Sequence, residues 1–187
     1  MFRIISIICV IITLVSANWV NDFDNSIYDQ IHLRWQSEFC DFYFPAVTHL
    51  GDAEFYLSAN LALFCFGDKK MKDSAKLSSV GLIGTMLTTQ TLKCIVDRPR
   101  PEHTDYSCCK SSFPSGHTTA AFTLAYIYGA QYPKYRVPLY ALAVSVALSR
   151  IYVGKHYPTD VIIGASIGTV GGIVVIHNKD FILSLGL

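Results

Sequence analysis

Residues 137–176, VPLYALAVSVALSRIYVGKHYPTDVIIGASIGTVGGIVVI, decide which class of fold this chain adopts. They hold two apolar segments, 137–153 and 161–176, and a short polar link joins them. An α-helix needs about 20 predominantly apolar residues to cross a bilayer, and both segments come close to that length. The stretch therefore predicts two neighbouring membrane-spanning helices that are connected by a polar turn.

Glycines mark one face of the second segment. Gly164, Gly168 and Gly172 recur every four residues and predict a ridge without side chains. Small residues at this spacing let two helices approach each other closely inside a membrane. We expect the ridge to pack inside a helical bundle in preference to forming a dimer, and the sequence leaves the oligomeric state open.

Three more apolar segments precede these two, at about 55–66, 77–96 and 118–132. The chain of 187 residues is 51% apolar and only 16% charged, with a mean hydropathy of +0.35, which separates it from ordinary water-soluble domains. We predict an all-α fold, a polytopic transmembrane helical bundle with about five spans. The first span is short and contains Ser58 and Asn60, so its ends are the least well defined.

The chain begins with a segment of the kind that directs export. Arg3 precedes an apolar run at 4–15, and small residues follow it. We interpret residues 1–17 as a signal peptide or a short first span. We expect residues 18–52 to form an extracytoplasmic interfacial segment and residues 53–187 to form the membrane-embedded domain.

The interfacial segment carries the pattern of an amphipathic helix. From Phe23 onward, apolar residues recur every four positions, at Ile27, Ile31, Trp35 and Phe39. Such a helix lies along the membrane surface, or it covers the protein's own helix ends as a lid. Both interpretations remain open, and neither gives the helix any chemistry.

Basic residues between the apolar segments predict the orientation. Lysine and arginine are enriched in cytoplasmic loops, and here they gather in two loops and near the C-terminus, at Lys69, Lys70, Lys72, Lys76, Lys134, Arg136 and Lys179. We therefore place residues 18–52, 97–117 and 154–160 on the outer side of the cytoplasmic (inner) membrane, facing the periplasm or the cell exterior. The net charge of +1 offers no basic surface for nucleic acid.

The six cysteines show no spacing typical of a metal site. Three fall within apolar segments, where we expect packing roles for Cys9, Cys65 and Cys94. The other three lie in polar connections, and an oxidising compartment would permit one disulfide, from Cys40 to Cys108 or Cys109.

Polar groups that are costly near a bilayer concentrate in three outer stretches. The first, KCIVDRPRP at 93–101, begins on a helix and leaves it, because proline disfavours helical geometry at the preceding residue. Lys93 and Arg100 can therefore point into one pocket. Taken alone, a lysine near the end of a span more often extends to the interface.

The second stretch, FPSGH at 113–117, immediately precedes an apolar helix. The backbone amides of Ser115, Gly116 and His117 can point outward with the positive helix end behind them, an arrangement that suits an anion. An ordinary serine N-cap would explain Ser115 and Gly116 but not the adjacent histidine.

The third stretch, SRIYVGKHYPTD at 149–160, holds His156 and Asp160 within reach of each other. A carboxylate that accepts the Nδ1–H of an imidazole fixes its tautomer and leaves Nε2 as a nucleophile. Arg150 adds a guanidinium, whose planar donors match the oxygens of phosphate. Asp160 by itself could also be an ordinary N-cap.

Together the three stretches resemble the signature of the type 2 phosphatidic acid phosphatase superfamily. Its patterns K-x6-R-P, P-S-G-H and S-R-x5-H-x3-D are complete and in order between residues 93 and 160. The resemblance implies a membrane-embedded phosphatase domain and covers residues 18–50 only loosely. It implies hydrolysis of a lipid phosphate monoester or diphosphate, such as polyprenyl diphosphate, phosphatidic acid, phosphatidylglycerol phosphate or lipid A.

The resemblance also implies a role for each matching residue. His156 would attack phosphorus, Asp160 would orient His156, and His117 would protonate the leaving oxygen before water hydrolyses the phosphohistidine. Fixed groups would hold the phosphate, namely Lys93, Arg100, Ser115, Gly116 and Arg150. No metal and no cofactor is implied, because positioning and positive charge are what phosphoryl transfer mainly needs.

Arg98 and four of the histidines lie outside the residues to which this resemblance gives a role. Arg98 lies beside the predicted pocket as a substrate contact or a headgroup anchor, and no role is predicted for the other histidines, His32, His49, His103 and His177.

A non-enzymatic lipid-phosphate binder or transporter would use the same cations, but it has no need of a nucleophile together with an acid. The vanadium haloperoxidases share the anion pocket, but they are soluble and much larger.

Overall fold

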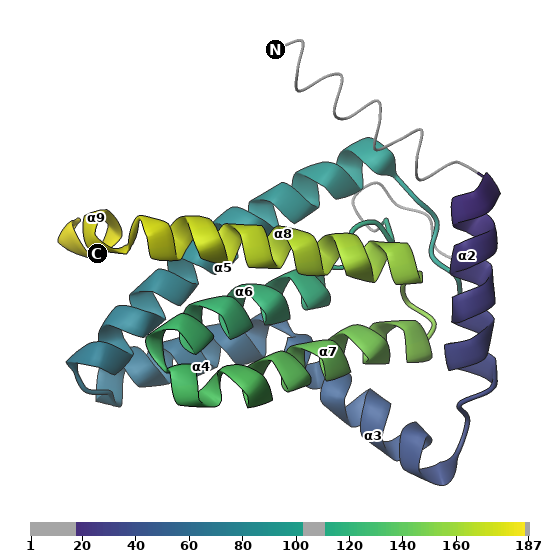
Figure 1. The fold of residues 1–187 in the computed structure, drawn as a ribbon, viewed down its shortest axis with the longest axis horizontal. Coiled ribbons are helices and arrows are strands. Elements are labelled where there is room, and N and C mark those ends of the chain that lie inside the picture. Colours follow the sequence, from purple (N-terminus) through teal and green to yellow (C-terminus); the bar gives the residue numbers. More distant parts are fainter. Residues whose placement is uncertain (1–17, 103–110, 186–187) are drawn as a thin grey trace.

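The computed structural model describes residues 18–102 and 111–185, which fold into helices joined by turns (Figure 1). The first part holds α2 (Asn18–Tyr28), a π-helical turn η1 (Asp29–Leu33), α3 (Glu38–Thr48) and a 3-10 turn η2 (His49–Gly51). The bundle follows, with α4 (Ala53–Phe66), α5 (Lys69–Val96), α6 (Gly116–Gln131), η3 (Pro133–Tyr135), α7 (Arg136–Tyr152), α8 (Pro158–His177) and α9 (Lys179–Ser184). The all-α prediction is confirmed, while the predicted signal segment, residues 1–17, lies outside the described residues.

The five bundle helices α4 to α8 coincide with the five predicted apolar segments. Within the described ranges, α8 is the one helix that is both long and apolar enough to cross a membrane, with 20 residues and a mean hydropathy of 1.9. Helix α4 is apolar but shorter. The helices are therefore where we expect them, and the number of spans remains a prediction.

The glycine ridge of α8 packs against α6. A Cβ on Gly168 would lie 2.3 Å from the carbonyl oxygen of Thr119, and a Cβ on Gly164 would lie 2.7 Å from that of Ser115. No side chain fits between the two backbones at these points. The ridge is an internal packing surface, as the four-residue spacing predicts.

Hydrogen bonds between buried polar side chains connect α4, α5 and α6. The Oδ1 atom of Asn60 accepts hydrogen bonds from Ser78 Oγ (2.9 Å) and Tyr128 Oη (2.8 Å). The Thr123 hydroxyl on α6 donates to Thr85 on α5. Polar contacts of this kind stabilise helix pairs where the surroundings supply no water.

The N-terminal helices cover one end of the bundle. In Figure 1, α2 runs across the end at which α7 and α8 are joined, and α3 lies against α7. Ile31 is 6% exposed and packs with Phe44, Ile151 and Tyr152. These contacts support the interpretation as a lid.

A continuous helix from Phe23 through Phe39 is not formed. The chain leaves helical geometry after η1, and Ser37 starts α3 by accepting a hydrogen bond from the backbone amide of Cys40. A serine that caps a new helix interrupts the old one.

The structure corrects two expectations about cysteines. Cys40 carries a free thiol and packs beside the cluster around Phe44, so the disulfide that the sequence would permit at Cys40 is not formed. Cys94, in the last turn of α5, is disulfide-bonded instead of serving as a packing residue, and its partner lies outside the described residues. Cys65 on α4 carries a free and exposed thiol.

The basic connecting loops meet at the other end of the bundle. Lys69, Lys70, Gln131 and Lys179 line one hollow, so the α4–α5, α6–α7 and α8–α9 connections lie together. Figure 1 shows this end at the left and the α7–α8 turn at the right. The bundle thus separates a lysine-rich end from the end that carries the three polar stretches.

Candidate active site

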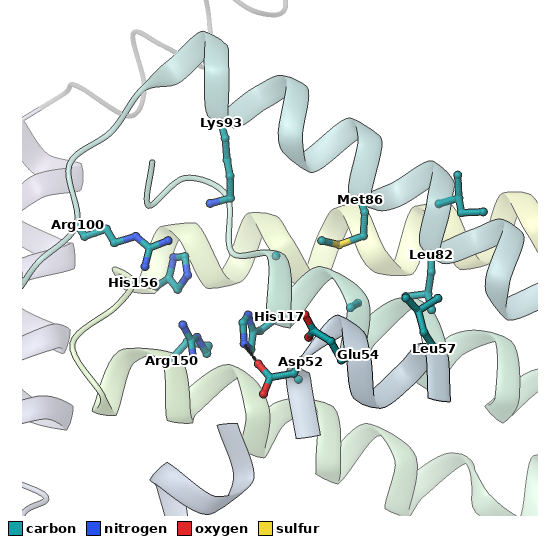
Figure 2. Close-up of a pocket in the computed structure, with 14 residues that line it drawn as sticks. Asp52, Glu54, Leu57, Leu82, Met86, Lys93, Arg100, His117, Arg150 and His156 are labelled. Atoms are coloured by element: carbon teal, nitrogen blue, oxygen red, sulfur yellow. Dashed lines mark hydrogen bonds and ion pairs between the residues drawn. The ribbon is translucent and has the colours of Figure 1, made fainter. Parts of the chain in front are cut away.

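The three polar stretches meet in one cavity of about 620 Å³ (Figure 2). Its polar end is formed by two histidines and three cations, which are His117, His156, Lys93, Arg100 and Arg150. In Figure 2 the three cationic side chains surround the two imidazoles from different helices and loops. The sequence prediction that these five side chains share one pocket is therefore correct in its geometry.

The end of α5 positions Lys93 and Arg100. Asp97 has left-handed backbone dihedrals (φ 44°) and ends the helix, after which Pro99 and Pro101 prevent it from continuing. The Lys93 ammonium donates to the carbonyl oxygen of Ser111 at 2.5 Å. Burial lowers the pKa of the Arg100 guanidinium from its ordinary value, although an arginine remains charged at neutral pH.

The start of α6 positions Gly116 and His117, both of which line the cavity. Ser115 precedes the helix but is fully buried behind it. Its amide donates to the carbonyl oxygen of Asp160, and its hydroxyl accepts from Thr118. Of the two residues of this stretch that are predicted to hold phosphate, Gly116 lines the cavity and Ser115 does not.

The turn between α7 and α8 brings His156 back beside Arg150. Gly154 adopts a positive φ of 70°, and the backbone amides of Lys155 and His156 both donate to the Arg150 carbonyl oxygen. Pro158 then begins α8. This compact turn fixes His156 and Arg150 at one end of the cavity.

The imidazole of His156 is oriented by a backbone carbonyl. Its Nδ1 lies 2.7 Å from the Ser112 oxygen, so Nδ1 carries the proton and Nε2 remains free. Asp160 lies farther from Nδ1, at 3.7 Å, because its two oxygens accept hydrogen bonds from Arg98 and from the Tyr157 amide. The sequence predicts Asp160 as the partner of Nδ1; in the structure the Ser112 carbonyl lies at hydrogen-bond distance and Asp160 at ion-pair distance.

Arg98 points away from the cavity. It forms ion pairs with Asp160 at 2.8 Å and with Asp24 of α2 at 2.6 Å, and its guanidinium lies over the Tyr157 ring. Asp24 is completely buried and also accepts hydrogen bonds from Thr159. Neither predicted role of Arg98 fits this arrangement, because its donors are already used inside the protein.

A residue outside the predicted set contacts His117. The Oδ1 atom of Asp52 lies 2.8 Å from Nε2 of His117, and its Oδ2 lies 3.1 Å from Nδ1 of His49. Burial raises the pKa of the Asp52 carboxyl, but the two histidine hydrogen bonds outweigh this effect and lower the pKa overall. In the sequence Asp52 has the appearance of an ordinary helix N-cap, which is why the pattern did not single it out.

The remainder of the cavity is mostly apolar, although the carboxylates of Asp52 and Glu54 also line it. Away from the cations it runs between α4 and α5, where its wall is formed by Leu57, Leu82, Ile83, Met86 and Ala120. Leu57 and Ile83 are more than half exposed at its outer edge. One cavity thus joins a cationic end to a hydrocarbon-lined end.

The described part of the chain contains no cluster of three or more histidine, cysteine, aspartate or glutamate side chains suited to a metal ion.

The sequence model of the PAP2 superfamily matches residues 76–182, which include all three polar stretches. The chain belongs to the PAP2 superfamily. This PAP2 protein is 30% identical to the lipid A 1-phosphatase of Rhizobium etli over 65% of its own length and 64% of that protein. It is 26% identical to the undecaprenyl-diphosphatase BcrC of Bacillus subtilis over 65% of its own length and 66% of the other. It therefore spans less than two-thirds of the length of these curated relatives.

A solved structure confirms the fold of this PAP2 protein. The transmembrane PAP2 type phosphatidylglycerolphosphate phosphatase of Bacillus subtilis superposes with a TM-score of 0.76 and 23% identity, over 96% of this chain and 95% of the other. At this identity the likeness shows the shared architecture of the helices.

Proposed function

We propose that this PAP2 protein hydrolyses the phosphate or diphosphate of a membrane lipid. The cavity carries the proposal: three cations and two histidines from three separate stretches line one end, and mainly apolar side chains line the rest, together with the carboxylates of Asp52 and Glu54. A phosphorylated headgroup fits the first part and a hydrocarbon chain fits the second. The names of the curated relatives, which include a lipid A 1-phosphatase and an undecaprenyl-diphosphatase, agree with such a substrate.

His156 acts as the nucleophile. Its Nδ1–H donates to the Ser112 carbonyl, and burial lowers its pKa to about 4, so Nε2 carries a lone pair at neutral pH. Attack on phosphorus gives a phosphohistidine, which water then hydrolyses. Asp160, at 3.7 Å, stabilises the positive charge that develops on the ring.

Lys93, Arg100 and Arg150 bind the phosphate oxygens, assisted by the backbone at Gly116. The Nε atom of Arg150 is buried and has no hydrogen-bond partner among the described residues, whereas its Nη1 is held by Thr48 at 2.6 Å. A phosphate oxygen would satisfy that donor. Fixed positive charge in a partly dry cavity stabilises the transition state without requiring a divalent cation, so we expect EDTA to leave the rate unchanged.

The protein lies in a membrane with the cavity end outside. The lysine-rich loops meet at the opposite end, as expected of a cytoplasmic side, and the Cys94 disulfide agrees with an oxidising compartment near the cavity end. The five helices α4 to α8 are the proposed spans. A substrate would reach the cavity from the outer leaflet.

Phosphate release by the purified protein in detergent tests the proposal. The substrates are polyprenyl diphosphate, phosphatidic acid, phosphatidylglycerol phosphate and lipid A. We expect at least one to be hydrolysed, with a loss of roughly a thousandfold or more in His156→Ala. His177→Ala, which changes an exposed histidine far from the cavity, serves as the control. If phosphate release is unchanged in His156→Ala, the activity comes from a contaminant. That result would favour the lipid-phosphate binder or transporter as the function of this protein.

A further inference from the structure

The side chain of Asp52 does not cap the helix that it precedes. Asp52 directly precedes α4, where an aspartate normally accepts a hydrogen bond from the first amides of its own helix. Here the side chain makes no capping bond. Both of its oxygens are instead turned to histidines, Oδ1 to Nε2 of His117 and Oδ2 to Nδ1 of His49. The carboxylate is thus committed to an imidazole that lines the cavity.

The backbone beside Asp52 is pressed against the same imidazole. Gly51 is buried, and a Cβ built on it would lie 2.8 Å from Cδ2 of His117 and 2.8 Å from Cγ1 of Val146. The Cδ2–Nε2 edge of the ring therefore faces the turn that carries Asp52. The opposite edge carries Nδ1, for which the described residues offer no hydrogen-bond partner. With Nε2 held, Nδ1 is the nitrogen left to meet a substrate.

The charges around His117 oppose its action as an acid. A general acid at this position must carry protons on both ring nitrogens, and Arg150 and Arg100 both face the ring. Nearby positive charges disfavour a further positive charge, whereas a carboxylate in contact favours it. Asp52 is the carboxylate in hydrogen-bond contact with the ring.

We propose that Asp52 is the positioning residue of the general acid: it binds Nε2–H of His117 and stabilises the imidazolium form, so that Nδ1–H faces the leaving oxygen. The proposal rests on the proposed phosphatase function. As the lone pair of His156 Nε2 forms the N–P bond, the P–O bond breaks, its electron pair stays on the leaving oxygen, and that oxygen takes the proton from Nδ1 of His117. When water attacks the phosphohistidine, Nδ1 takes a proton from it and the N–P electron pair returns to His156.

The variant Asp52→Asn tests this role with two substrates that differ in their need for an acid. The Asp52 side chain makes no capping bond to α4, so its replacement by asparagine, which has the same shape, preserves the start of the helix. A long-chain alkyl phosphate releases an alkoxide that must be protonated, whereas 4-nitrophenyl phosphate releases a stable phenolate. We expect kcat/KM, which reports cleavage of the P–O bond and not the later hydrolysis of the phosphohistidine, to fall about 10- to 100-fold with the alkyl phosphate and to stay within about threefold with 4-nitrophenyl phosphate.

Two controls separate this role from a structural one. Glu38→Gln removes an exposed carboxylate from α3 and should change neither rate. In a His117→Ala background, Asp52→Asn should cost nothing more with the alkyl phosphate, because the group that it serves is already absent.

An equal loss with both substrates, or no loss with the alkyl phosphate, would overturn the proposal. Should Asp52→Asn fail to fold, Asp52→Ser replaces it, since serine is also a good cap, and the same outcomes decide. A wild-type protein that releases phosphate from neither probe and from no lipid of the panel would instead remove the phosphatase function itself.

Discussion

Burial is the property that suits His156 to its proposed role as the nucleophile. Its side chain is 2% exposed and is surrounded by Lys93, Arg150 and Asp160. Removal from water disfavours the charged imidazolium, which lowers the pKa to about 4 from an ordinary 6.5, even though Asp160 acts in the opposite direction. The same residue in an exposed loop would be half protonated near pH 6.5 and would lose its lone pair there.

The first prediction concerns the pH dependence of the reaction. Protonation of Nε2 removes the nucleophile, so kcat/KM should fall as the pH decreases through about 4, not through 6.5. The measurement is phosphate release between about pH 3 and 8, with the ionisation of the substrate phosphate near pH 6 titrated separately and divided out. An acid limb near 6.5 after this correction would show that His156 is not desolvated in the working enzyme.

At the scale of elements, the contact between α6 and α8 aligns the second and third polar stretches. The Ser115 amide at the start of α6 donates to the Asp160 carbonyl at the start of α8. Farther along, the Gly164 and Gly168 backbone lies directly against α6. The distance between His117 and His156 therefore depends on how closely these two helices approach.

The second prediction follows from this close approach. In Gly168→Ala the new Cβ would lie 2.3 Å from the Thr119 carbonyl oxygen, so the helices must separate. Overpacking of this kind costs about 1–3 kcal/mol, and we expect a lower unfolding midpoint together with a lower kcat. Gly84→Ala on α5 is the matched control, because nothing lies within 4 Å of its added Cβ. Equal stability of the two variants would contradict the packing described here.

At the scale of the whole molecule, the bundle keeps its cationic cavity and its lysine-rich loops at opposite ends. Helices α2 and α3 belong to the cavity end, where Asp24 joins Arg98 and Asp160 in one buried ion-pair network. Removing one partner from such a network leaves a buried charge unpaired, which is strongly destabilising. The N-terminal cover is thus tied to the residues that surround the nucleophile.

The third prediction concerns orientation in the membrane. In a variant that keeps Cys94 and its disulfide partner and has serine at the four other cysteine positions, Glu38→Cys should react with a membrane-impermeant maleimide in intact cells, and Lys70→Cys should not. Both should react after the cells are broken, which shows that each thiol is accessible. Labelling of Lys70→Cys in intact cells would reverse the proposed topology.

The sequence by itself determines which residues come together. Apolar segments give the five bundle helices, glycines at every fourth position give α8 a face that packs closely inside the bundle, and the three polar stretches give the cavity side chains, because each is a local pattern of burial, spacing or backbone restriction. The tertiary structure decides which partner each polar group takes: Ser112 at His156, Asp52 at His117, Asp24 at Arg98, and a disulfide at Cys94. These choices depend on distances between segments far apart in the chain, and a buried donor binds whichever acceptor the fold brings nearest.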